Sequence, residues 1–522
     1  MSRFSINRQY TLFYLLCSLF LLSCTNNPGH KSVPEAAPIY LNSNDTLQFL
    51  PDSLNDADIE TGTISLSNRR FQQFTLKNGL IIYYLPDDNL PNINIAVIVD
   101  AGKYQFNSKD ERLSPLVLKL LKQGTHKYSR AAFQKRMSLL GKPMDYRQTA
   151  QYSVISAEIL PQDFELALDL IAQQLKALNP GSEALRKVLE QQLLENKLTQ
   201  SSGAYLAKLL FYQNNYPPEH LYYHLQPDSD EIKKVTIDDL MDFYQKKYKP
   251  QRSRIIISGD IEPKLLKQQI EAFFSDWISP PSNNVENQTL KKTGQLEPEL
   301  VPSNSFFENK AADNKSHFDF IERKGSQQVD LLYGVVTVPR QSADWLSLKI
   351  IASLIGGGPS SRLFADLREK QGLAYFISAR QLAGRYSSPF LIQTSVAHNK
   401  LIPAINGINN HINSLCHNKI KKHELEQIKQ QLSGETVFKL QTNQQLVNNK
   451  IHQLENILAD DYLLAEIKKI KMITAKQLFI AANKYLCGKH NIIAVGQTNK
   501  LEKTFRNELT DYVYQEHYLP LH

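Results

Sequence analysis

The chain has 522 residues, of which 42% are hydrophobic and 21% charged, and its 60 lysines and arginines against 52 acidic residues give a formal net charge of +8. This apolar content excludes a disordered chain, and the length predicts several domains, each able to bury a core. Four cysteines are too few for a disulfide-stapled miniprotein or a multi-cysteine zinc ribbon. The positive charge is spread along the chain without a basic block, so no nucleic-acid partner is expected.

The first residues are typical of an export signal. Arg3 and Arg8 precede an apolar run of 11 residues, Leu12 to Leu22, which is about half the length of a bilayer span. The run ends in Leu21-Leu22-Ser23-Cys24, which resembles the lipobox of bacterial lipoproteins and implies cleavage before a lipidated Cys24. An ordinary signal peptide with a chance cysteine is the alternative interpretation.

The lipobox resemblance predicts a signal peptide over 1–23, a tether over 24–67 and a lipid-anchored protein in the bacterial cell envelope. Aspartate directly after the lipidated cysteine would be the usual signal for retention in the inner membrane. Because Thr25 holds this position, we expect the protein to be anchored in the outer membrane, facing the periplasm. No later stretch approaches the ~18 apolar residues of a spanning helix, so we expect attachment through the lipid anchor only. In an oxidising periplasm, a disulfide between Cys416 and Cys487 and two buried free thiols both remain open.

The two halves of the chain carry the same pattern at a constant offset. Gly259 ends a β-rich run, and Gly496 ends a similar run 237 positions later. The same offset relates the β-rich runs around Ile98 and Val335. Strand and amphipathic-helix patterns alternate within each half. We therefore predict an α+β fold of two homologous sheet-plus-helices domains in tandem, 68–285 and 314–522, joined by a linker over 286–313.

Two sequence strings carry a family resemblance. In the first half, an Asn78-Gly79 hairpin, a strand and a helix are followed by Gln123-Gly124-Thr125, which ends the helix. The second half contains two strings in close succession: Gly356-Gly357-Gly358-Pro359-Ser360-Ser361-Arg362-Leu363-Phe364 and Leu367-Arg368-Glu369-Lys370-Gln371-Gly372-Leu373-Ala374-Tyr375. Together they resemble the pitrilysin/insulinase-type (inverzincin) zinc peptidases, among them the processing peptidases, which are built from homologous α+β domains in tandem. The glycine triplet is a weak candidate for a phosphate loop, because no Lys-Ser/Thr pair follows it.

The resemblance implies a His-x-x-Glu-His motif on the first helix, in which both histidines ligate zinc and the glutamate polarises its water. Counting back from Gln123-Gly124-Thr125, these positions hold residues that can neither ligate zinc nor act as a base: Pro115, Leu118 and Lys119. The further ligand falls near Gln191 or Gln192. We therefore expect no catalytic residue in this motif and no metal bound by this chain. We place Pro115 at the first position of its helix and hypothesise that the Lys119 ammonium takes the place of the metal.

Other residues do not replace the motif. His220 and His224 are four positions apart beside Glu219, but a double proline and aromatic residues indicate a loop without a third ligand. His423 begins an imitation of the motif that ends in glutamine, which is typical of a solvated helix face. Serine or cysteine catalysis has no local signature here.

The second half retains an arginine–tyrosine pair. The resemblance implies that Arg368 and Tyr375 hold the backbone of a peptide substrate and steady the tetrahedral intermediate, and we add a glycine-rich substrate loop of Gly356, Gly357 and Gly358. The chemistry suits them, since a guanidinium is a fixed fork for carbonyls and a phenol can donate to an oxyanion. The alternative is structural: Arg368 pairs with Glu369 or Asp366, and Tyr375 is a half-buried strand residue.

The loss of the zinc residues and the retention of the arginine–tyrosine pair predict the function. The resembling peptidases close a chamber with four domains, so this two-domain chain resembles the non-catalytic subunit of a heterodimeric periplasmic zinc metallopeptidase. It would close the chamber and lend substrate-binding residues to a partner that carries His-x-x-Glu-His and the zinc. The alternatives are a structural or peptide-binding envelope lipoprotein with no proteolytic role and, third, an autonomous zinc metalloendopeptidase.

Overall fold

The computed structural model describes residues 70–103, 108–218, 220–278, 316–497, 509–510 and 512–518. The predicted signal peptide, Cys24, the tether and the linker over 286–313 lie outside these residues, so the domain boundaries stay predictions. Residues 67–522 form one compact unit that contains two sheets. In the part of the chain that is described, no helix is both long and apolar enough to cross a membrane.

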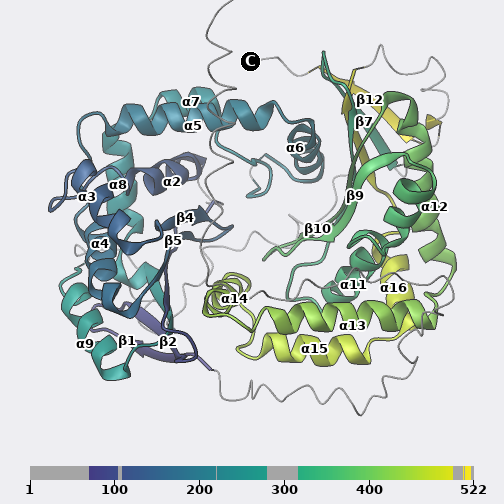
Figure 1. Cartoon of the computed structure of the whole chain (residues 1–522). Coiled ribbons are helices and arrows are strands. Elements are labelled where there is room, and N and C mark those ends of the chain that lie inside the picture. The colour runs from purple at the N-terminus through teal and green to yellow at the C-terminus, as the bar shows by residue number, and fades with distance from the viewer. Residues whose placement is uncertain are drawn as a thin grey trace, which may run out of the picture. The chain divides into compact units, whose positions relative to one another are not determined.

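The first half builds a six-stranded sheet in the order β1-β2-β6-β3-β5-β4. Strands β1, β2, β4 and β5 of this sheet are labelled in Figure 1. The hairpin predicted from Asn78-Gly79 is confirmed: β1 and β2 pair antiparallel, and Gly79 takes a φ of +90° in the turn. β2 and β6 are parallel, whereas β3 pairs antiparallel with both β5 and β6. The strands are β1 (Gln72–Thr75), β2 (Ile81–Pro86), β3 (Ile93–Val99), β4 (Asp145–Gln148), β5 (Ser153–Ile159) and β6 (Ser253–Gly259).

Helices bury the core of the first half. The helix after β5 has the amphipathic pattern expected of this half, since Phe164, Leu168, Ile171 and Leu175 are all buried in α4. The helices of this half are α2 (Ser108–Leu120), α3 (Arg130–Met137), α4 (Phe164–Lys176), α5 (Ala184–Gln200), α6 (Gly203–Asn215), α7 (Ser229–Lys233), α8 (Ile237–Lys247) and α9 (Pro263–Phe274).

The second half repeats this architecture. Its sheet has the order β12-β7-β11-β8-β10-β9; β7 is parallel to both β11 and β12, and the other pairs are antiparallel. The strands are β7 (Ser316–Glu322), β8 (Val329–Thr337), β9 (Ala374–Gln381), β10 (Ser388–Val396), β11 (Asn491–Gly496) and β12 (Tyr512–His517). The helical segments are α11 (Trp345–Gly356), η6 (Phe364–Lys370), α12 (Leu401–His417), α13 (Lys422–Phe438), α14 (Asn443–Asn456), α15 (Tyr462–Met472) and α16 (Ala475–Tyr485). The predicted tandem α+β fold is confirmed.

Each half lends one helix to the sheet of the other. α6 of the first half packs on β8 and β11 of the second sheet, and its Phe211 is fully buried there. Phe211 needs the glycine opposite it, because a Cβ on Gly334 would lie 2.4 Å from its ring. In return α14 packs on β3 and β6 of the first sheet through Val447 and Ile451. This exchange explains why two similar halves form one compact unit.

Candidate functional site

The three residues at the degenerate motif lie on α2. The helix begins at Ser108, so Pro115 is an interior residue and its prediction as the first helical position is wrong. The acidic residues Asp110 and Glu111 occupy the first turn, where they favour an earlier start of the helix. Proline inside the helix removes the backbone donor that would bond the Glu111 carbonyl. The neighbouring Ser114 fixes the helix to the segment after β3, since its hydroxyl lies within hydrogen-bond distance of the carbonyls of Ala101 (2.7 Å) and Gly102 (2.8 Å).

Lys119 points into the protein rather than to solvent. Its ammonium donates to Gln192 Oε1 at 2.8 Å and pairs with Glu195 Oε2 at 2.9 Å, and its side chain is only 15% exposed. Gln192 in turn donates to Asn196 Oδ1 (2.9 Å), and Asn196 donates to the Pro227 carbonyl (2.9 Å). The ammonium therefore lies against the α5 segment in which the further zinc ligand is predicted, as the Lys119 hypothesis requires.

The side chains at this position do not fit zinc. Leu118 is packed in the hydrophobic core, and an ammonium at Lys119 repels a dication. Burial and the nearby charge of Lys119 lower the pKa of Lys122. Lys122 therefore lies close to the same position, and its ammonium form adds to the repulsion of a metal ion. Across the described ranges, no group of three or more His, Cys, Asp or Glu side chains could hold a metal ion. At α2, the positions of the motif thus offer no zinc ligand.

The other histidines singled out in the sequence have structural surroundings. His220 is 4% exposed, stacks on Tyr216 with ring centroids 4.4 Å apart, and its Nδ1 accepts from the Tyr222 amide at 3.0 Å. Burial lowers its pKa to about 4. The prediction of a wholly solvated face at His423 is only partly right: His423 is exposed, but the adjacent Glu424 accepts two bonds from Arg362, at 2.6 and 2.7 Å.

Arg368 and Tyr375 are brought together at the edge of the second sheet. The Arg368 guanidinium lies 5.5 Å from the centre of the Tyr375 ring and 4.4 Å from that of Phe364. Its contact with Glu369 is long, at 3.5 Å between exposed side chains, so that pair holds it weakly. Asp366, the other acid considered for it, bonds His411 at 2.8 Å instead.

Tyr375 is 80% exposed, so its prediction as a half-buried strand residue is wrong. The cause is a β-bulge: the pairing of β9 with β10 shifts register between Thr394 and Val396, which breaks the strict alternation of inward and outward side chains. Phe376, the next residue, is also exposed, at 42%. β9 is the terminal strand of its sheet, so these side chains stand beside backbone groups that no described strand pairs.

The glycine triplet has a structural explanation for two of its members. A Cβ on Gly356 would lie 2.3 Å from the Ala379 nitrogen of β9, and one on Gly357 would lie 2.6 Å from Ser353. Gly358 has open space around it. Gly356 and Gly357 therefore let the end of α11 pack closely against β9, and only Gly358 leaves free backbone for a ligand to approach.

Replacing Lys119 tests whether its ammonium is a structural substitute. We expect Lys119→Met to lower the free energy of unfolding by about 2 kcal/mol, because the buried Gln192 oxygen would lose its donor while the aliphatic stem is kept. Urea unfolding measures the change. The matched control is Arg186→Met on α5, whose pair with Glu190 is exposed at both ends and should matter by less than about 0.5 kcal/mol. Equal midpoints for the two variants would contradict a structural role for the ammonium.

Comparison with known proteins agrees with this arrangement. A family model described as "Peptidase M16 inactive domain" matches residues 234–432. An uncharacterized zinc protease of Rickettsia bellii is 22% identical over 445 residues, which cover 82% of this chain and 98% of the relative. A non-peptidase homolog of Helicobacter pylori, YmxG, is 21% identical over 377 residues, covering 71% of this chain and 81% of the relative. A crystal structure of a peptidase M16 inactive domain from Pseudomonas fluorescens has a TM-score of 0.69 at 20% identity, covering 83% of this chain and 99% of that chain.

The matched family segment begins directly after α7 and ends within α13, so it includes parts of both halves. The solved structure shares the fold over nearly its whole length. At the motif of the active enzymes, this chain has a core leucine and a bonded lysine. The chain is therefore similar to the pitrilysin-like M16 peptidases, and the part that matches the M16 inactive-domain model is residues 234–432.

Proposed function

We propose that the protein is the non-catalytic subunit of a heterodimeric zinc metallopeptidase of the bacterial cell envelope. The observation that carries the proposal is the contrast between its two sites. Lys119 is bonded to α5 where the metal chemistry is missing, whereas Arg368 and Tyr375 stand together at an exposed sheet edge. A chain that kept only a structural role would have no need for a guanidinium held only weakly by Glu369 beside an 80% exposed tyrosine.

Peptide binding at this edge follows from the chemistry of the groups. An extended peptide can add to β9 through main-chain hydrogen bonds, since the outer edge of β9 has no partner strand in the described part of the chain. Tyr375 and Phe376 would contact the peptide's side chains, and the Arg368 guanidinium would bind a backbone carbonyl. The partner subunit would carry His-x-x-Glu-His and the zinc, and the two chains together would close the chamber.

The envelope location is part of the proposal. Lipidation at Cys24 would hold the chain at the outer membrane, facing the periplasm. The bonding of Cys416 to Cys487, with their Cα atoms 5.8 Å apart, supports an oxidising compartment. Replacing Cys24 by alanine should release the protein from the membrane fraction or leave it unprocessed, which a gel shift and palmitate labelling would detect.

Co-purification in mild detergent tests the function. We expect a second chain with an intact His-x-x-Glu-His motif to co-purify, and the complex to have peptidase activity that a chelator abolishes. Recovery of a lone, inactive chain would favour a structural or peptide-binding envelope lipoprotein instead.

Arg368→Ala tests the peptide site within that complex. We expect it to weaken peptide binding about tenfold, because a charge-assisted hydrogen bond to the substrate is lost. Fluorescence anisotropy of a labelled extended peptide measures the change, with a parallel drop in kcat/KM. The matched control is Arg130→Ala, which removes an exposed arginine from α3 and should leave both unchanged. Proteolysis unaffected by Arg368→Ala would rule out the proposed role of this edge.

A further inference from the structure

Exposed lysines cover α15, α16 and the start of α13. None of them forms an ion pair with a residue that the structure describes, although other lysines of the same helices do: Lys429 pairs with Glu426, and Lys484 with Asp344. We call this set the basic surface, and its members are Lys421, Lys422, Lys468, Lys469, Lys471 and Lys476. Each carries a charge that no acidic residue in the described part of the chain pairs with.

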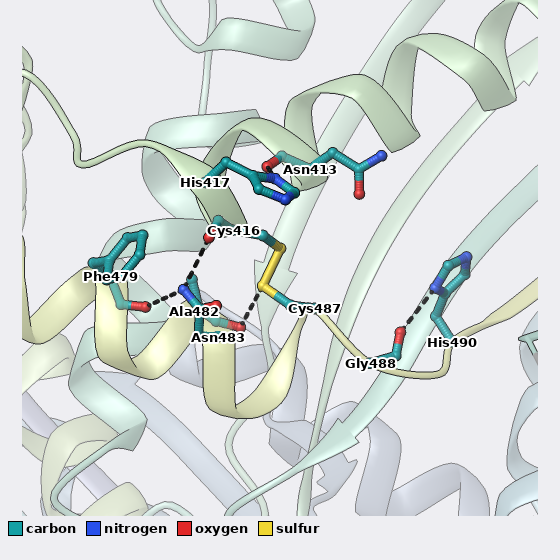
Figure 2. Close-up of a disulfide and its surroundings, with 9 residues drawn as sticks. All are labelled: Asn413, Cys416, His417, Phe479, Ala482, Asn483, Cys487, Gly488 and His490. Carbon is teal, nitrogen blue, oxygen red and sulfur yellow. Dashed lines mark hydrogen bonds between the residues drawn. A yellow bond between two sulfur atoms is a disulfide. The ribbon is translucent and has the colours of Figure 1, made fainter. Parts of the chain in front are cut away.

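A disulfide holds the two segments of the basic surface together. Cys416, at the end of α12, is bonded to Cys487, which follows α16, with their Cα atoms 5.8 Å apart (Figure 2). The side-chain amide of Asn483 donates to the Cys416 carbonyl at 3.2 Å, as Figure 2 shows. α13 also packs along α15 (Figure 1). Lys421 and Lys422 stand at the start of α13, the helix that packs along α15, although they lie far from Lys468 to Lys476 in the sequence.

Acidic residues do not offset this charge. The sequence has none between Glu369 and Glu424, and none between Glu466 and Glu502. Glu424 is occupied by Arg362, and the buried Glu466 by Arg340 and Lys349. The basic surface is thus a local excess of positive charge, in contrast to the first half, where lysines such as Lys233 and Lys234 pair with acids on the same helix.

Two exposed apolar side chains lie among the lysines. Met472 is 71% exposed beside Lys471, and Ile480 is 54% exposed one helical turn beyond Lys476. Lysines that surround isolated apolar side chains are typical of surfaces that rest on a lipid headgroup layer. The large exposed aromatic residues of the described chain lie elsewhere, so the surface has no platform on which nucleic-acid bases could stack.

We infer that the basic surface docks on a membrane that contains anionic phospholipids. The lysines would bind headgroup phosphates, and Met472 and Ile480 would enter the interface between them. Docking would fix the orientation of a chain that its proposed lipid anchor only tethers. The inference goes beyond the proposed function: it uses the envelope location but neither the partner subunit nor the peptide site.

Vesicle sedimentation tests the inference without partner or peptide. The chain from Thr25 onward keeps the whole compact unit of residues 67–522 and lacks the segment proposed for lipidation. We expect it to bind vesicles of phosphatidylcholine mixed with phosphatidylglycerol, to leave pure phosphatidylcholine vesicles unbound, and to be released by salt. The triple variant Lys468→Gln, Lys471→Gln, Lys476→Gln should lose about 100-fold in affinity, about fivefold per lysine.

A matched triple variant provides the control. Lys135→Gln, Lys264→Gln and Lys267→Gln remove the same charge from exposed positions on α3 and α9 and should change binding by less than about twofold. Met472→Ser with Ile480→Ser should weaken binding about tenfold without changing its salt dependence. Equal binding to both kinds of vesicle, equal losses in the two triple variants, or binding to polyglutamate without binding to vesicles would each overturn the inference.

Discussion

Acidification from about pH 7 to about pH 5 is expected to destabilise the protein by several kcal/mol. Burial lowers the pKa of His220, His452 and His490 to about 4, whereas the same side chains in the unfolded chain have their usual value of 6.5. Below pH 6.5 the unfolded chain therefore takes up protons that the folded chain does not bind. The contribution of these three histidines is full above about pH 6.5 and is lost as the pH falls toward 4, by roughly 2 kcal/mol for each at about pH 5. Glu111, whose pKa burial raises to about 7, acts in the opposite direction and offsets part of this loss.

Urea unfolding at several pH values measures this effect, and His220→Asn isolates one contribution. The Asn oxygen can accept the Tyr222 amide bond that His220 Nδ1 accepts now, but it takes up no proton. We expect this variant to lose about a third of the acid destabilisation. The exposed His423, changed to Asn, is the matched control and should leave the pH profile as it is. A profile that is flat between pH 7 and pH 5 would contradict the expectation.

Reduction of the Cys416–Cys487 disulfide is expected to cost about 4 kcal/mol. The two cysteines are 71 positions apart, and a cross-link that closes so long a loop removes much conformational freedom from the unfolded chain. The urea midpoint should therefore fall when a reductant is added. The double variant Cys416→Ser, Cys487→Ser should have the lower urea midpoint without reductant, and adding reductant should not change that midpoint. A wild-type midpoint that does not respond to reductant would show that the bond contributes nothing to stability.

The tandem fold can be predicted from the sequence because each copy of the repeat carries the same local sequence patterns. Strand patterns and glycines recur at one offset, and Gly259 and Gly496 end equivalent strands of the two sheets. The loss of the zinc site can likewise be predicted from the sequence, because Pro115, Leu118 and Lys119 are residue types that do not ligate zinc wherever they lie in the fold. What Lys119 does instead is not local: its partners Gln192 and Glu195 lie on another helix.

Predictions that depend on packing or register fail for physical reasons. Tyr375 is exposed because a bulge breaks the alternation of β9, and a bulge has no signature in a short strand. The ion pair of Arg362 and Glu424 joins residues 62 positions apart, and no local sequence pattern around either residue predicts it. The basic surface is likewise not visible as a run of lysines in the sequence. Its two segments are far apart along the chain and are connected in the fold by helix packing and a disulfide.

The exchange of α6 and α14 has a consequence for how the chain is made. When α6 emerges from the ribosome, the strands that receive it, β8 and β11, have not been synthesised, and β11 ends only at Gly496. Phe211 and its aromatic neighbours therefore have no partner strand until most of the chain has been synthesised. The first sheet, in turn, keeps a bare apolar face until α14 arrives. We therefore expect neither half to be stable when it is expressed without the other.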